Sequence, residues 1–145
     1  MMRSLRFHPA RLLAAMLLAA TSGCAESDAA KVERAERNLH EQLRQSKFAE
    51  IYRQTSPTLQ SSETEEEFVA KLREIGQRTG EIVSIEKADD ATNVASQKSP
   101  AGRTSYVQSI YLVKGKSRSC YEVSLWMIEG GEARLLAYDC LSSSK

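Results

Sequence analysis

A change in the spacing of apolar residues at Gly80 restricts the fold of this 145-residue chain more than any other feature. Before Gly80, apolar side chains recur every three or four residues, which is the period of a helix face. After it, they alternate with polar side chains, as in a strand. A helical half followed by a strand half predicts an α+β fold. We expect three N-terminal helices packed on a curved four-stranded antiparallel meander.

The helical half divides into three expected helices with recognisable ends. The middle helix should end at Ser56-Pro57, because a proline disfavours helical backbone in the residue before it. The third helix should begin with a capping box of Ser62 and Glu65 and should stop at Gly80. The apolar stripe of the first helix comprises Val32, Ala35, Leu39 and Leu43, and that of the third comprises Phe68, Leu72 and Ile75.

The strand half contains one stretch without periodicity. Residues 88–103 show no alternation and include Pro100 and Gly102, so we expect a long loop there. The four expected strands are residues 81–87, 104–113, 120–128 and 133–140.

The last hairpin can be drawn in two registers. A two-residue turn of Gly130 and Gly131 would leave Cys120 opposite Leu141, whereas a three-residue loop ending at Gly131 places Cys120 opposite Cys140. We favour the second register, because Gly131 then takes the left-handed position that such loops prefer. Directly opposed residues lie within disulfide reach, so we predict a Cys120–Cys140 disulfide worth roughly 3 kcal/mol. The alternative is a pair of buried thiols.

The first 23 residues have the pattern of a secretory signal peptide. Arg3, Arg6 and Arg11 precede an uncharged apolar run at residues 12–20, and small residues follow it. Nine helical residues cover about 14 Å, far less than the roughly 30 Å hydrocarbon core of a membrane. A permanent transmembrane helix is therefore not expected.

The stretch "TSGC" at residues 21–24 resembles a bacterial lipobox, in which small residues precede a cysteine that is acylated. This resemblance implies that Cys24 becomes a lipid-modified N-terminus, and ordinary signal cleavage is the alternative. Ala25 after the cysteine favours delivery to the outer membrane, by resemblance to enterobacterial sorting. Lipidation of Cys24 also leaves two cysteines, Cys120 and Cys140, which can pair in an oxidising compartment.

Removal of the signal peptide leaves one domain with little net charge. The remaining chain has 17 basic and 19 acidic side chains, a net charge of −2, which argues against a nucleic-acid partner. One histidine and two paired cysteines cannot make a tetrahedral metal site, and no cofactor motif is present, so neither a metal nor a cofactor is expected. The expected parts are a signal peptide (1–23), a tether (24–30), the α+β domain (31–141) and a tail (142–145).

Two stretches carry a family resemblance: "FAEIYRQTSPTLQSSETEEEFVAKLREIGQRTGEIVS" and "EGGEARLLAYDC". From about Leu39 to Tyr138 the chain resembles the nuclear-transport-factor-2-like (cystatin-like) cone. It is also similar to small bacterial secreted proteins and lipoproteins classed as domains of unknown function. Enzymes on this fold commonly place a histidine and an aspartate inside the cone. The resemblance therefore implies a possible His40–Asp139 pair acting as a general base.

The fold alone does not supply a function. We expect a lipid-anchored binding or scaffolding module without catalysis, on the periplasmic face of the outer membrane; the inner membrane or the free periplasm are alternatives. Its partner would be an envelope protein or a small apolar ligand, or a second copy of the chain could cover the same face. The alternatives are a lyase or isomerase using His40 and a carboxylate, and an inhibitor of the toxin-immunity type. The expected binding residues on a concave sheet face are Tyr106, Trp126, Leu136 and Tyr138.

Overall fold

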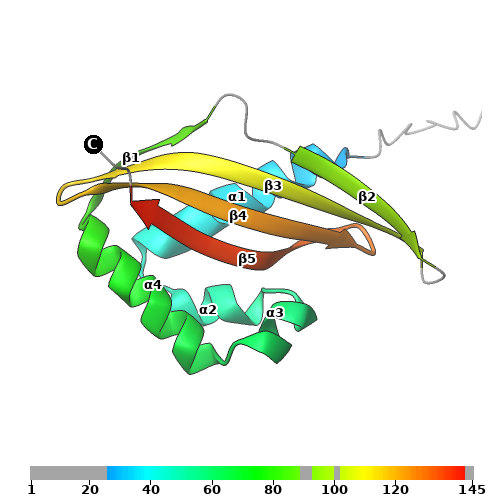
Figure 1. Ribbon diagram of the computed structural model, residues 1–145, viewed down its shortest axis with the longest axis horizontal. Coiled ribbons are helices and arrows are strands. Elements are labelled where there is room, and N and C mark those ends of the chain that lie inside the picture. The colour runs from blue at the N-terminus through cyan, green and yellow to red at the C-terminus, as the bar shows by residue number, and fades with distance from the viewer. Residues whose placement is uncertain (1–25, 89–92, 100–101, 143–145) are drawn as a thin grey trace, which may run out of the picture.

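The computed structural model describes residues 26–88, 93–99 and 102–142, with only the backbone of residues 93–99. Cys24 and the predicted signal peptide lie outside this part of the chain. The fold is α+β, as predicted, with α1 behind the strands and α2–α4 below them in Figure 1. The elements are α1 (Asp28–Arg44), α2 (Phe48–Arg53), α3 (Pro57–Ser62), α4 (Glu65–Thr79), β1 (Ile82–Lys87), β2 (Asn93–Ser99), β3 (Gly102–Gly115), β4 (Ser119–Glu129) and β5 (Glu132–Ser142).

The described part of the chain has four helices where three were predicted. Ser56-Pro57 starts α3 instead of only ending α2, because the Ser56 hydroxyl accepts a hydrogen bond from Leu59 N at 3.1 Å and proline suits the first helical position. The predicted capping box was two residues too early, since it is Thr64 and Glu67 that cap α4. Gly80, with φ 74°, ends that helix as predicted.

The hydrophobic core lies between the helices and one face of the sheet. Both predicted helix stripes face it, and the side chain of Phe68 is fully buried in it. Burial of a side chain of this size contributes about 1.5–3 kcal/mol. α1 begins at Asp28, so its first turn occupies the end of the segment predicted as a tether. The buried core includes Val32, Leu39, Ile51, Leu59, Phe68, Leu72, Ile75, Val107, Trp126, Ile128, Leu135 and Tyr138.

The sheet runs in the order β1-β3-β4-β5, and β2 also pairs with β3. β1 pairs with the end of β3 and β2 with its beginning, so together they form an interrupted edge strand. The prediction of a loop over residues 88–103 was therefore wrong for residues 93–99. These residues show no alternation, but β3 extends back to Gly102 and offers its backbone groups along the whole length of β2.

The β4–β5 hairpin differs from the predicted register. Gly130 and Gly131 form a two-residue turn, both with positive φ (61° and 87°), and Glu129 pairs with Glu132. A bulge then adds Leu136 to β5, between the Trp126–Leu135 and Leu125–Ala137 pairs. A bulge changes which face the following residues occupy, so Leu135 and Tyr138 both face the core although they are three residues apart.

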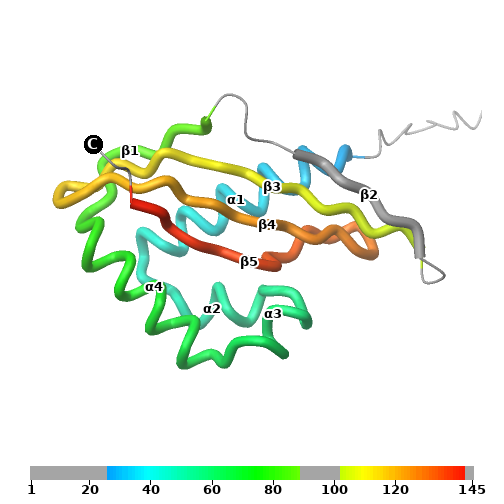
Figure 2. Tube along the Cα trace, viewed as in Figure 1, coloured from blue at the N-terminus to red at the C-terminus, as the bar shows by residue number. Residues whose placement is uncertain are grey.

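The turn between β3 and β4 is attached to the end of α4, as the tube in Figure 2 shows at the left. The carbonyl oxygen of Thr79 accepts hydrogen bonds from Ser117 N at 3.1 Å and Arg118 N at 3.3 Å. Gly115 permits this approach, because a Cβ there would lie 2.1 Å from the same oxygen. The turn therefore satisfies a carbonyl that the helix leaves free.

Candidate functional site

The four residues predicted to form one binding face do not share a surface. Trp126 and Tyr138 lie under the helices, with 4% and 6% of their surface exposed. Tyr106 pairs with Met127, next to Trp126 on β4, so its side chain is on the opposite face of the sheet. Leu136 sits at the bulge. Of the four, only Tyr138 lines the cavity described below.

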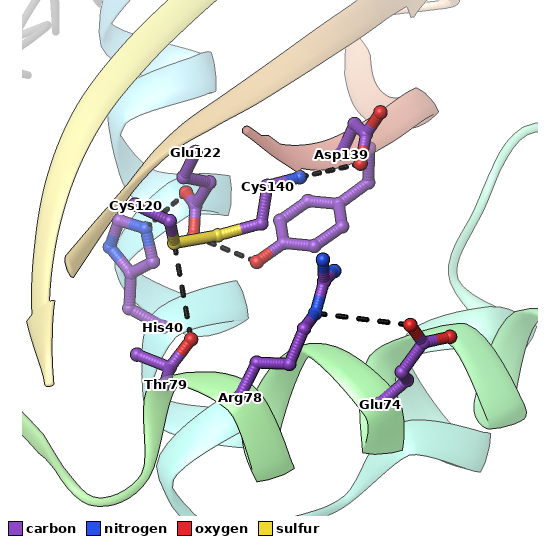
Figure 3. Close-up of a disulfide and its surroundings, with 9 residues drawn as sticks. His40, Glu74, Arg78, Thr79, Cys120, Glu122, Asp139 and Cys140 are labelled. Carbon is purple, nitrogen blue, oxygen red and sulfur yellow. Dashed lines mark hydrogen bonds and ion pairs between the residues drawn. A yellow bond between two sulfur atoms is a disulfide. The ribbon is translucent and has the colours of Figure 1, made fainter. Parts of the chain in front are cut away.

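Cys120 and Cys140 lie at disulfide-bonding distance, as predicted, with Cα atoms 5.8 Å apart (Figure 3). The pairing is diagonal, since Cys120 opposes Ser142 and Cys140 opposes Glu122. The hydroxyl of Thr79 lies 4.0 Å from the Cys120 sulfur, at the end of α4. The disulfide thus borders the region where the sheet meets α4.

His40 is buried, and its partner is Glu122 rather than Asp139, the partner that the alternative enzyme hypothesis required. His40 Nε2 on α1 lies 2.7 Å from Glu122 Oε1 on β4, and the hydroxyl of Tyr138 donates to Glu122 Oε2 at 3.0 Å. Asp139 is on the exposed face and accepts a hydrogen bond from the backbone N–H of Cys140 (Figure 3). The two-residue alternation could have identified Glu122, because it places Glu122 on the same face as Cys120.

A second buried carboxylate lies one turn earlier on α1. Glu36 is 1% exposed, and the Tyr111 hydroxyl donates to its Oε2 at 2.5 Å. Ser124 Oγ lies 3.4 Å from the other Glu36 oxygen, and the Trp126 ring N–H donates to Ser124 at 3.0 Å. The donors to Glu36 within the described residues are thus neutral hydroxyls.

Both tyrosines remain protonated hydrogen-bond donors. Burial is the largest cause that raises the pKa of Tyr138, and the neighbouring charge of Glu122 is the next. Burial also raises the pKa of Tyr111, with its hydrogen bond to Glu36 as the next cause. A deprotonated tyrosine would lose its hydrogen bond and place two negative charges side by side.

A cavity of about 550 Å³ opens between the α1–α2 junction, α4 and the sheet. Glu122, Tyr138 and Cys140 line its sheet side, whereas His40 is not part of the lining. Gly76 lines the α4 side, where a Cβ would meet no atom within 4 Å. The apolar lining consists of Leu43, Phe48, Leu72, Ile75, Ile82 and Val113.

Within the described ranges, no cluster of three or more histidine, cysteine or acidic side chains could hold a metal ion. No helix in the same ranges is long and apolar enough to cross a membrane. Comparisons with protein-family models, with curated protein sequences and with solved structures found no match.

Proposed function

We propose that this protein is a lipid-anchored binding module of the bacterial cell envelope, which holds a small, largely apolar ligand without chemical change. The observation that carries the proposal is the 550 Å³ cavity, whose size falls in the range of small-molecule sites. Its apolar side chains would bury the body of a ligand. The few polar groups on the sheet side would set its orientation.

The anchoring part of the proposal depends on the N-terminal sequence. A basic start, a short apolar run and "TSGC" favour export and acylation of Cys24, with the outer membrane as the destination. The domain itself is proposed to be a nuclear-transport-factor-2-like cone. The helices that precede the sheet and pack on one of its faces support this proposal.

Gly76 offers a direct test of binding in the cavity. We would titrate the neutral fluorescent probe N-phenyl-1-naphthylamine into the full chain carrying Cys24→Ser, so that no detergent is needed. A Gly76→Phe side chain should enter the cavity and weaken probe binding at least tenfold. The matched control Gly76→Ala should keep the affinity within about twofold. Probe binding that Gly76→Phe leaves unchanged would overturn the proposal, as would the absence of binding to the parent chain.

The second candidate is an enzyme that uses the same cavity. The observation in its favour is that Glu122 lines the cavity while His40 and Tyr138 hold both of its oxygens, at 2.7 and 3.0 Å. Such a carboxylate could act as a base toward a bound ligand. The two candidates differ in the effect of Glu122→Gln on a ligand captured from cells. Turnover that this variant abolishes, with binding retained, would establish the enzyme.

A further inference from the structure

We propose that the ligand is an amphipathic anion, whose acidic head binds Arg44 and Arg73 and whose apolar body fills the cavity. This inference rests on the proposed binding function and names the chemical class of the ligand. It applies to carboxylate, sulfonate and phosphate heads alike, because arginine binds all of them through paired N–H donors.

Two arginines from different helices line the same cavity. Arg44 is the last residue of α1 and Arg73 lies in the middle of α4, and both are exposed. Neither forms an ion pair within the described residues. The helix dipole accounts for a cation at the end of α1 but not for one in the middle of α4.

Three other arginines of the helices have acidic partners, whereas Arg37 on α1 forms no ion pair within the described residues and does not line the cavity. Arg34 pairs with Glu26 at 2.9 Å, and Arg53 pairs with Glu65 at 3.5 Å. Arg78, one turn beyond Arg73 on α4, lies 3.9 Å from Glu74. Unlike these three paired arginines, Arg44 and Arg73 have guanidinium donors that no carboxylate of the described residues accepts, and unlike Arg37 they line the cavity.

The acidic side chains of the lining are already occupied. Glu81 accepts a hydrogen bond from Lys116 at 2.6 Å, and the oxygens of Glu122 are bonded to His40 and Tyr138. The charge without a partner at the cavity is thus positive. An anion would be attracted to it, and attraction between exposed charges should weaken as salt is added.

The apolar surface begins next to these cations. Leu43 precedes Arg44 on α1, and Leu72 precedes Arg73 on α4, and both leucines line the cavity. Leu72 is almost fully buried, so it faces the interior, whereas Arg73 is exposed. A ligand with a charged head and an apolar body fits this arrangement, in which an apolar surface lies next to two cations.

The test compares two probes that differ in one group. 8-Anilinonaphthalene-1-sulfonate has the aromatic body of N-phenyl-1-naphthylamine plus a sulfonate. Both are titrated into the full chain carrying Cys24→Ser, with Arg44→Gln/Arg73→Gln as the double variant. Arg37→Gln is the matched control, because Arg37 is exposed on α1 but does not line the cavity.

We expect the parent chain to bind the sulfonate at least tenfold more tightly than the neutral probe. The double variant should lose this preference with neutral-probe affinity unchanged, whereas Arg37→Gln should change neither value. The preference should also fall between 50 and 500 mM salt, and dodecanoate should displace the sulfonate better than dodecanol does.

Equal binding of the two probes to the parent chain would overturn the inference, as would a preference that survives in the double variant. Sulfonate binding that Gly76→Phe does not block would also overturn it, because the probe would then occupy another surface. In all three cases, the proposed binding function would still hold if Gly76→Phe blocks binding of the neutral probe. If Gly76→Phe does not weaken neutral-probe binding, the proposed binding function itself fails.

Discussion

Replacement of His40 by leucine should reduce the free energy of unfolding by about 3–5 kcal/mol, the usual cost of removing one partner from a buried pair. Glu122 is 1% exposed, and His40 is its closer donor, at 2.7 Å. Leucine cannot donate a hydrogen bond, so the carboxylate would keep only the Tyr138 hydroxyl, at 3.0 Å.

The double variant His40→Leu/Glu122→Leu should be more stable than His40→Leu alone by about 2 kcal/mol or more. Removing both partners eliminates the buried charge, and two apolar side chains of similar size then pack against each other. The coupling energy from the two single variants and the double variant should therefore be at least about 2 kcal/mol. His40→Gln, which can still donate to Glu122, should cost less than His40→Leu.

Urea unfolding measures these free energies, with Trp126 as the reporter. It is the only tryptophan of the chain, is 4% exposed and bonds to Ser124 in the same buried region. The stabilities follow from linear extrapolation to zero urea. Two results would refute the reasoning: His40→Leu within 1 kcal/mol of the parent, or a double variant whose loss equals the sum of the single losses.

Three further predictions concern other parts of the chain. Because the pKa of Tyr138 is raised in the folded state, the unfolded chain ionises first, and stability should fall above pH 10 by about 1.4 kcal/mol per pH unit. Tyr111, which is more exposed, should contribute less to this loss of stability. Urea unfolding from pH 9 to 11 should show the decline, and its slope should be smaller in the Tyr138→Phe variant. Gly115→Ala should cost at least about 1–3 kcal/mol in thermal or urea unfolding, because its Cβ meets the Thr79 carbonyl, and a loss below 0.5 kcal/mol would contradict the packing. Cys24→Ser should move the protein from the membrane to the soluble fraction and remove the acyl mass by intact mass spectrometry, whereas a parent protein with the plain polypeptide mass would refute lipidation.

The periods of the apolar residues were sufficient to predict the fold class and most of the core. Side chains at Val32, Leu39, Phe68 and Leu72 are buried where the helical period placed them. The proximity of the two cysteines was also predicted, although the register used to derive it was wrong. A diagonal pair across neighbouring strands reaches bonding distance as well as a directly opposed pair does, with Cα atoms 5.8 Å apart here.

The features that were missed depend on tertiary contacts. β2 has no periodic pattern of its own and exists through its pairing with β3. The bulge at Leu136 changes the face of every later residue of β5, which moved Asp139 to the exposed side and left Glu122 as the partner of His40. Buried glutamates are rare without a partner, and the sequence alone gave no partner for Glu36. The cavity was not predictable either, because it is the space that seven separate helices and strands leave between them.

The two buried polar contacts of α1 also determine how far the helix lies along the sheet. Glu36 and His40 are one turn apart and bind Tyr111 of β3 and Glu122 of β4. A slide of one turn in one direction would bring Glu36 against Glu122, and two buried carboxylates repel each other. A slide in the other direction would carry the exposed Arg44 into the position of His40. Apolar contacts are not directional and would tolerate either slide. These polar pairs therefore select one position of α1 on the sheet as the chain folds.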